Sequence, residues 1–220
     1  MGRLEDGRGR GLLDALDHEA RAAVHRRNKS RPFCLYVAHE AVHSPFQGPD
    51  SPIQRGPKKD RARTKTPVEA AYVQMMTAMD ECVGQVLGKL VELKLEKNTL
   101  VIFCSDNGPV GDDGYKDGAL EKMGDHKPGG PFSGGKYSVL EGGTRTPFIT
   151  YWPGHIAPGV SKEMVCTIDL AASLAALADV KLPKAAVPDS FNLLDALLGK
   201  RGAKGRDHLV QQDNGRGGNY

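Results

Sequence analysis

Short runs of apolar residues alternate along the chain with longer segments whose apolar residues recur at helical spacing. The runs "FCLYVA" (33–38), "TLVIFC" (99–104) and "PFITYW" (147–152) predict three buried strands. The second run is continuously apolar from Leu100, which is typical of a parallel strand that helices cover on both faces. "HLVQQ" (208–212) is a weaker pattern that also fits a strand.

Helical spacing appears in four segments. Residues 11–27 predict an amphipathic helix, and residues 167–180 and 190–199 predict two more. Thr66 and Pro67 open a long helix, because proline suits a first helical turn, where no N–H donor is needed. Its apolar stripe indicates core packing rather than a cofactor site, and it comprises Val68, Tyr72, Met75, Met76, Met79, Val83, Val86, Leu87 and Leu90.

The order of these segments predicts a fold class. Strands alternate with helices, and the crossovers between strands are long. Such an order predicts an α/β domain with a mostly parallel sheet and helices on both faces. Residues 108–135 are rich in glycine and proline and predict a long irregular loop, of the kind that is functional or disordered.

Composition narrows the function classes only slightly. The chain has 220 residues, of which 39% are hydrophobic and 26% charged, as in ordinary soluble globular proteins. Its net charge of +3 gives no argument for nucleic-acid binding. Basic residues cluster in "QRGPKKDRARTK" (54–65), which indicates either a solvated loop or a segment that steers an anionic substrate.

The cysteines and the N-terminal segment give information about the cellular compartment. Cys34, Cys82 and Cys104 lie in apolar stretches, so we expect buried thiols rather than a disulfide framework, and Cys166 forms no CxxC pair with them. No apolar run approaches the roughly 18 residues that span a bilayer, and the first thirty residues lack a signal-peptide core. These features predict a soluble chain without a transmembrane segment or an export signal in these residues, and they leave localisation open.

Polar side chains follow the strand predicted at 99–104. In "SDNGP", Asp106 and Asn107 precede Gly108 and Pro109, and this composition by itself favours a simple turn. The alternative is a metal site, because carboxylate and amide oxygens are hard ligands suited to calcium or magnesium.

Two further stretches lie close to predicted strands. His39 and His43 leave the first strand in "VAHEAVHSPFQ" (37–47), and Lys136 follows two glycines in "SGGKYSVLEGGTRTP" (133–147). Paired glycines let the backbone approach an anion that an ammonium neutralises, although each stretch alone also fits a surface loop. Open α/β sheets bind ligands at the carboxyl ends of their strands, where all three stretches are expected. "DDGYKDGALE" (112–121) lacks the spacing of an EF-hand loop, and neither GxSxG nor a Walker lysine occurs.

Taken in order, these motifs resemble the sulfatase family of the alkaline-phosphatase-like superfamily. The order is a strand and "HSP", a long helix, "SDNGP", a glycine-rich loop, "GGK", "EGGTRTP" and "WPGHIAPG". The resemblance covers residues 32–160, and "TIDLAASLAALADV" (167–180) and "PDSFNLLDALLG" (188–199) continue it to about residue 199.

The resemblance implies roles for individual residues. Asp106 and Asn107 look like two ligands of the family's divalent metal, usually calcium, and Lys136 looks like the lysine that holds the sulfate group. His43 looks like the histidine beside the ester oxygen that assists the leaving group. Glu141 and Arg145 fall on an EGGxR segment that we interpret as structural; the implied substrate is a sulfate-ester small molecule or a sulfated saccharide.

One family element has no counterpart. Sulfatases use a cysteine or serine in C/S-x-P-x-R that becomes formylglycine, and no cysteine or serine of this sequence has that setting. The family's other metal ligands, an aspartate pair, also have no counterpart before residue 33. We therefore expect part of a catalytic domain at 32–199, a helical lead-in at 1–31 and a basic linker and tail at 200–220, and we expect this chain alone to be inactive.

Two other functions stay open at this level. One is hydrolysis of phosphoryl or phosphonyl esters, since that chemistry also binds a tetrahedral anion at a metal in this superfamily. The other is a non-catalytic relic that only binds anions or packs against a partner. Members of the family are often exported.

Overall fold

The computed structural model describes residues 31–44, 46, 68–110, 113, 125–183 and 185–212. The chain divides into two compact units: unit 1 comprises residues 1–96 and 109–131, and unit 2 comprises residues 97–108 and 132–220. The helix predicted at 11–27 and the basic cluster at 54–65 lie outside the described residues. No helix in the described ranges is long and apolar enough to cross a membrane.

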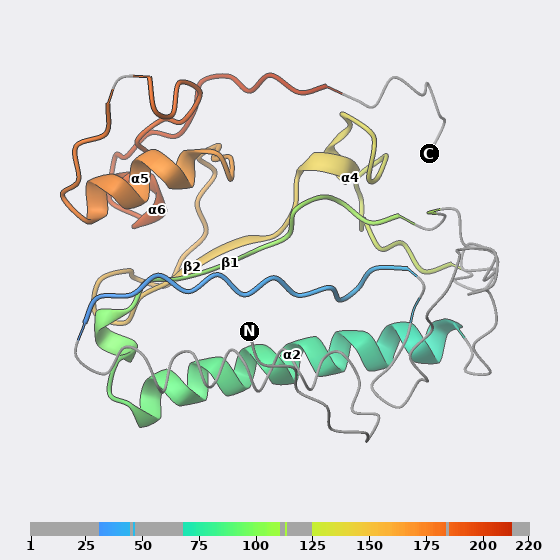
Figure 1. The fold of residues 1–220 in the computed structure, drawn as a ribbon. Coiled ribbons are helices and arrows are strands. Elements are labelled where there is room, and N and C mark those ends of the chain that lie inside the picture. The colour runs from blue at the N-terminus through green and yellow to red at the C-terminus, as the bar shows by residue number, and fades with distance from the viewer. Residues whose placement is uncertain are drawn as a thin grey trace, which may run out of the picture. The chain divides into compact units, whose positions relative to one another are not determined.

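Unit 1 is built on helix α2 (Val68–Glu92), where the sequence predicts its long helix (Figure 1). The buried side chains of α2 recur three, four or eight positions apart, so they share one face; they are Ala71, Met75, Ala78, Cys82 and Leu90. Part of the predicted stripe is confirmed as core, but Met76 is 39% exposed, because it lies one position off that face. α2 ends near Lys94, whose φ of 58° is left-handed, and a 3-10 turn, η2 (Glu96–Asn98), follows.

The strand predicted at 33–38 is not present among the described residues. These positions alternate between half-buried and exposed, and Tyr36 is 88% exposed. No described segment pairs with them, so the prediction of a fully buried strand is wrong for this structure. The apolar run predicted burial, but a strand is buried only where other segments cover it, and the run itself carries no information about those segments.

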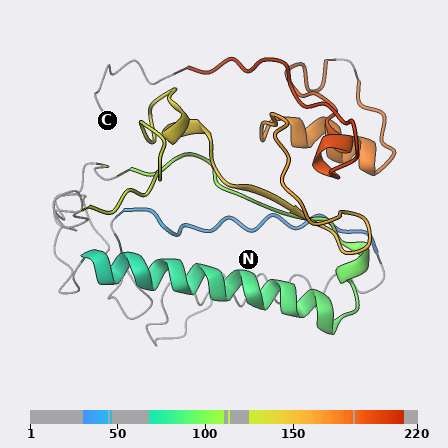
Figure 2. The ribbon, with the colours of Figure 1, turned by 180° about the vertical axis from the view of Figure 1, so that it is seen from behind.

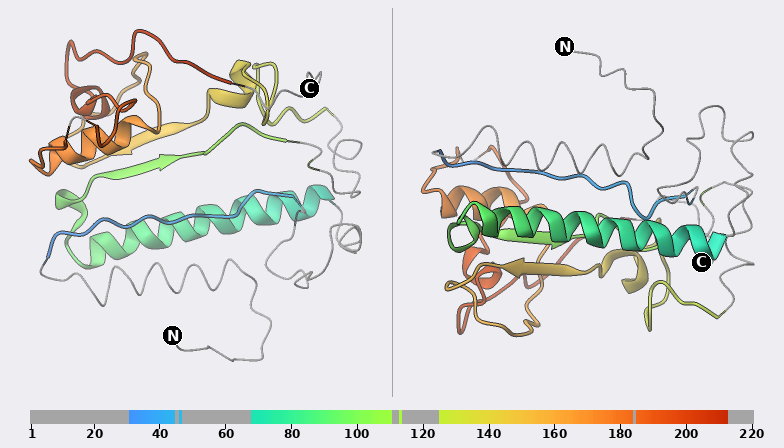
Figure 3. Two further views of the ribbon diagram at one scale, coloured as in Figure 1. Left: turned by 45° about the horizontal axis from the view of Figure 1, so that its top comes forward. Right: turned by 90° about the horizontal axis from the view of Figure 1, so that it is seen from below.

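Unit 2 contains the two remaining strands, β1 (Val101–Cys104) and β2 (Phe148–Tyr151), side by side in a two-stranded sheet (Figures 1 and 3). Their pairing is antiparallel, with Val101 opposite Tyr151 and Cys104 opposite Phe148. The described sheet therefore differs from the mostly parallel sheet that the sequence predicts. The predicted burial of these two runs is wrong as well, since no residue of β1 or β2 is buried and Ile149 is 57% exposed. Burial and strand direction both depend on where other parts of the chain lie, which the apolar run does not encode.

Helices α5 (Asp169–Leu177) and α6 (Leu194–Leu197) complete unit 2 and confirm two predicted helices in shorter form. They pack side by side (Figures 1 and 2). Thr150 of β2 donates its Oγ1 hydrogen bond to the carbonyl oxygen of Leu197 at 2.8 Å, which ties the sheet to α6. Residues 208–212 form no strand with any described segment.

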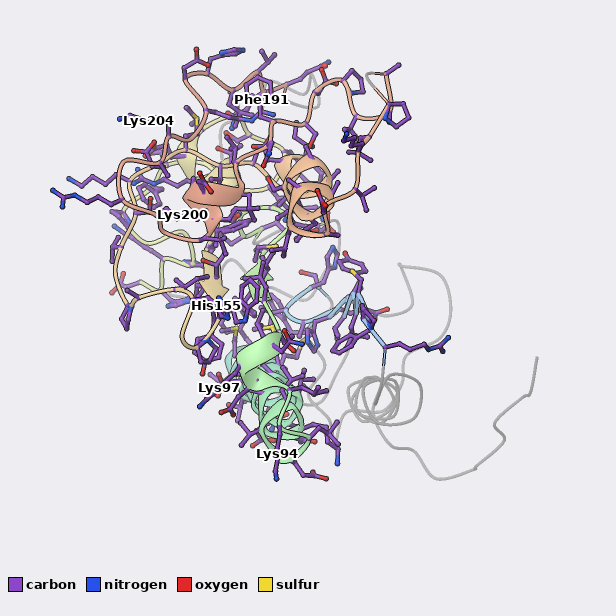
Figure 4. All side chains as sticks on the ribbon, turned by 90° about the vertical axis from the view of Figure 1, so that its left-hand side faces the viewer. Lys94, Lys97, His155, Phe191, Lys200 and Lys204 are labelled. Atoms are coloured by element: carbon purple, nitrogen blue, oxygen red, sulfur yellow. The ribbon has the colours of Figure 1, made fainter. Side chains whose placement is uncertain are left out.

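A buried ion pair holds the helical part of unit 2 together. The Asp169 carboxylate, fully buried, accepts hydrogen bonds from Arg206 at 2.8 Å (Nε) and 2.6 Å (Nη2). It also accepts the backbone N–H groups of Phe191 (2.9 Å) and Cys166 (3.0 Å). The Arg206 guanidinium in turn lies 4.0 Å from the ring centroid of Phe191, which is labelled in Figure 4.

Each of the four cysteines carries an unbridged thiol, as the sequence predicts. Cys82 is buried on α2, which confirms its assignment to the core. The other two cysteines that the sequence places in the core, Cys34 and Cys104, are exposed. That part of the prediction is wrong: Cys34 lies on the outward side of a segment of alternating exposure, and Cys104 is the exposed last residue of β1.

Candidate functional site

The turn that follows β1 carries Asp106 and Asn107. Ser105 Oγ donates to the carbonyl oxygen of Asn107 at 2.9 Å, and the backbone N–H of Asn107 donates to Asp106 Oδ1 at 2.9 Å. Asn107 Nδ2 donates to the carbonyl oxygen of Gly108, also at 2.9 Å. The turn therefore fixes both side chains locally and engages the amide nitrogen of Asn107, which leaves its Oδ1 as the acceptor atom for a ligand.

Glycines join this turn to helix α4 (Glu141–Thr144). The backbone N–H of Gly108 donates to the carbonyl oxygen of Gly143 at 2.9 Å. A Cβ atom on Gly108 would collide with the carbonyl oxygen of Gly142, so only glycine allows the turn to approach α4 this closely. A backbone contact, rather than side-chain packing, thus positions Asp106 and Asn107, the two candidate metal ligands.

The loop that carries Lys136 packs against the same two glycines. Gly142 donates its N–H to the carbonyl oxygen of Ser133 at 2.8 Å, and a Cβ on Gly142 would lie 2.6 Å from that oxygen. A Cβ on Gly143 would collide with the carbonyl oxygen of Gly135. Gly108 and residues 133–135 therefore both contact one Gly-Gly pair, Gly142 and Gly143.

The backbone around Lys136 is held in unusual conformations. Gly134 has φ of 84° and Tyr137 has φ of 79°; the second value is rare for a residue with a side chain and costs about 1–3 kcal/mol. Lys136 is partly buried, and its Nζ lies 5.3 Å from the centroid of the Tyr137 ring. Arg145 pairs with Glu141 at 3.2 Å on the exposed side of α4 and covers the Phe132 ring at 4.9 Å. These contacts support a structural role for Glu141 and Arg145.

The donor atoms at 106–107 fit a calcium ion only in part. A carboxylate and an amide oxygen are the hard donors that calcium prefers, but the ion takes about 6–8 of them. Within the described ranges, no group of three or more His, Cys, Asp or Glu side chains could hold a metal ion. Asp106 and Asn107 are therefore suited to supply two ligands of a larger coordination sphere.

Cys104 precedes the Asp106 turn and is not suited to act as a nucleophile. Although Cys104 is largely exposed, partial desolvation raises the pKa of its thiol, and the negative charge of Asp106 raises that pKa further. The thiolate is the reactive form of cysteine, so both effects suppress its reactivity at neutral pH.

His43 lies in unit 1, on a segment that packs against α2. Phe46, 4% exposed, forms a core cluster with Ala71 and Met75 and meets the Tyr72 ring edge-on at 5.3 Å. Ala41 and Val42 pack against the same cluster. The apolar residues on both sides of His43 thus anchor its loop, while the imidazole itself stays half exposed.

Both ring nitrogens of His43 face oxygen atoms. Nδ1 lies 2.7 Å from the carbonyl oxygen of Ser44, and Nε2 lies 3.2 Å from Asp113 Oδ2. Two other polar groups of this segment, His39 Nδ1 and Ser44 Oγ, are buried and make no hydrogen bond with any described residue. Burial lowers the pKa of His39, so this histidine is suited to remain neutral.

The structure thus joins three of the four predicted site residues within unit 2 and places the fourth, His43, in unit 1. Sequence reasoning missed Asp113, because its stretch was tested only against the EF-hand spacing and set aside. It also missed the role of Gly108, Gly142 and Gly143. The repeated glycine pairs were visible in the sequence, but their mutual contact was not.

Comparison with known proteins gives a consistent result. The sequence matches the family described as Sulfatase over residues 9–180. It is 39% identical over 202 residues to the N-acetylgalactosamine-6-O-sulfatase of Bacteroides thetaiotaomicron, which covers 92% of this chain and 37% of that protein. It is 36% identical over 186 residues to arylsulfatase A of Homo sapiens, which covers 84% of this chain and 32% of that protein.

A solved structure agrees in fold. A Bacteroides thetaiotaomicron protein described with the metabolism of multiple glycosaminoglycans superimposes with a TM-score of 0.75 at 35% sequence identity. The match covers 92% of this chain and 39% of that chain. The present chain therefore spans less than two-fifths of the length of each of these three relatives.

Proposed function

Because the chain belongs to the sulfatase family, we propose that it forms part of the active site of an enzyme that hydrolyses a sulfate ester to an alcohol and inorganic sulfate. The observation that carries the proposal is the contact of two loops on one Gly-Gly pair. Gly142 and Gly143 allow the close approach both of Gly108 and of residues 133–135. Through this contact, the segments that carry the candidate metal ligands Asp106 and Asn107 and the Lys136 ammonium belong to one part of unit 2.

Each proposed role follows from charge. Asp106 and Asn107 would hold a divalent cation, calcium being the one that best matches their oxygen donors, and that cation would supply positive charge to the sulfate group. Lys136 binds a sulfate oxygen and offsets the charge that shifts toward the leaving oxygen in the transition state. His43 gives a proton to the departing alkoxide, which is a poor leaving group without one.

The substrate we propose is a sulfated sugar. The relative with 39% identity is named N-acetylgalactosamine-6-O-sulfatase, and the arylsulfatase A relative is 36% identical. A sugar alcohol is a much poorer leaving group than a phenol, so its departure depends on the proton that His43 would provide. The family's formylglycine has no C/S-x-P-x-R counterpart in these 220 residues, and we therefore expect no turnover by this chain alone.

Kinetics of the complete protein test the proposal. We expect hydrolysis of sugar 6-sulfates and of aryl sulfates, with phosphate esters cleaved far more slowly. The variant His43→Ala should lose roughly 10²-fold or more of kcat/KM for the sugar sulfate and much less for an aryl sulfate with an activated phenolate. Faster cleavage of phosphate esters would favour the phosphoryl alternative. Absence of any turnover, with sulfate still bound, would favour the non-catalytic relic.

A further inference from the structure

The Asp113 carboxylate approaches the edge of His43 where a proton transfer would occur. The carbonyl oxygen of Ser44 can only accept a hydrogen bond, so His43 Nδ1, 2.7 Å away, carries a proton. That contact fixes the tautomer and leaves Nε2 as the nitrogen that gains or loses a proton. Nε2 is the atom that faces Asp113, at 3.2 Å.

Asp113 is also placed where its charge acts strongly. Its side chain is 10% exposed, whereas that of His43 is 50% exposed. A partly buried carboxylate interacts with a nearby cation more strongly than a surface carboxylate, because less water screens the pair. A proton on Nε2 completes a charge-assisted hydrogen bond to Asp113, and loss of that proton leaves two acceptors facing each other.

We propose that Asp113 is a positioning residue for His43: it favours the ring form with a proton on Nε2 and holds that edge of the imidazole in a fixed direction. The inference rests on the proposed role of His43 as proton donor. In the reaction, an oxygen nucleophile of the complete protein bonds to sulfur as the bond between sulfur and the leaving oxygen breaks. The proton leaves Nε2, and with it the hydrogen bond to Asp113, and passes to the leaving oxygen, so that His43 becomes neutral. Asp113 itself loses and gains no proton in this step.

The pair of His43 and Asp113 also connects two separate segments of the chain. Asp113 belongs to the glycine-rich stretch between β1 and α4, whereas His43 belongs to the loop anchored on α2 by Phe46 and Val42. The two are 70 positions apart in the sequence, so the ion pair links segments that no local pattern connects. Asp113 thereby brings a residue of the glycine-rich stretch into direct contact with the proposed proton donor.

Nitrogen NMR on the 220-residue chain tests the pair independently of catalysis. With histidine labelled at both ring nitrogens, and His43 assigned among the seven histidines by His43→Gln, the Nε2 signal of His43 reports its contact with Asp113. Asp113→Asn should move that signal, and Asp113→Glu should restore it. Asp80→Asn, which removes an exposed carboxylate from α2, is the matched control and should leave the signal unchanged.

Kinetics of the complete protein give the second measurement. Asp113→Asn should lower kcat for a sugar sulfate by roughly 10-fold, with little change in KM and little effect on an activated aryl sulfate. An unchanged His43 signal in Asp113→Asn would overturn the proposal even if the enzyme hydrolyses sulfates. A changed signal in a protein that cleaves no sulfate ester would instead retain the ion pair and refute the proposed function.

Discussion

The backbone N–H of Gly108 donates to the carbonyl oxygen of Gly143 at 2.9 Å, and this bond joins the turn of Asp106 and Asn107 to helix α4. The bond is possible because neither residue has a side chain between the two backbones. Position 108 therefore helps to fix the geometry of the candidate metal site, since its carbonyl oxygen also accepts a hydrogen bond from the Asn107 side chain. This contact and the charged groups of unit 2 lead to five predictions.

Substitution of Gly108 should be costly. Gly108→Ala would place a Cβ against the Gly142 carbonyl oxygen, so we expect a loss of about 1–3 kcal/mol in the free energy of unfolding, as for other overpacked sites. Gly84→Ala is the control, because a Cβ at this α2 position meets nothing within 4 Å. The control should stabilise the helix by about 0.5–1 kcal/mol. Urea unfolding measures both, and equal stability of the two variants would contradict the close approach at Gly108.

The Asp169–Arg206 pair should be worth more than an exposed pair. Arg206→Ala leaves a buried carboxylate without its cation, and we expect a loss of about 3–5 kcal/mol in the free energy of unfolding. Lys200→Ala breaks the pair with Asp195, whose partners are 58% and 63% exposed, and should cost about 0–1 kcal/mol. Similar losses from the two variants would show that the buried pair contributes no more than the surface one.

The same pair predicts the acid response of the protein. Burial opposes ionisation of Asp169, but the hydrogen bonds from Arg206, Phe191 and Cys166, together with the charge of Arg206, outweigh it and lower the pKa of Asp169. The unfolded chain therefore binds this proton more readily than the folded chain. The stabilisation is complete above the unfolded pKa of about 3.9 and is lost as pH falls through the lower folded value.

Urea unfolding between neutral pH and about pH 3 measures this response. The free energy of unfolding should fall with acidification in the unsubstituted protein, and the fall should be smaller in Asp169→Asn, which has no carboxylate to protonate. Asp195→Asn, at the exposed pair, should follow the unsubstituted curve. A fall of the same size in Asp169→Asn would place the acid sensitivity elsewhere.

Calcium binding by the 220-residue chain should be weak. Asp106 and Asn107 offer two of the 6–8 oxygen ligands that calcium takes, so we expect a Kd no tighter than about millimolar, at the weak end of protein sites. The complete protein should bind far more tightly, and Asp106→Ala should remove most of that difference. Calorimetric titration decides the matter, and micromolar binding that survives Asp106→Ala would mean that the metal binds at other residues.

Lys136 should matter for the transition state more than for stability. Lys136→Ala in the complete protein removes one preorganised positive charge, and we expect kcat/KM to fall roughly 10²-fold or more. Lys162→Ala removes an exposed lysine of unit 2 and is the matched control. Steady-state hydrolysis of an aryl sulfate measures both variants, and an equal, small effect would refute a direct contact between Lys136 and sulfate.

The sequence by itself determined the family, the helix at α2 and the positions of β1, β2, α5 and α6. Each of these depends on local information: apolar spacing selects a helix or strand, and ordered short motifs such as SDNGP and GGK identify the sulfatase family. The candidate residues Asp106, Asn107, Lys136 and His43 came from the same motifs. Their roles stay predictions.

Only the tertiary structure decided which segments meet. The antiparallel pairing of β1 with β2, the contact of Gly108 with Gly143 and the pairing of His43 with Asp113 all join residues that are distant in the sequence. No local pattern encodes such contacts, because they depend on where the chain returns after a loop. Burial is decided in the same way: the apolar run at 33–38 is extended but exposed at Tyr36, since a strand is buried only where another part of the chain covers it.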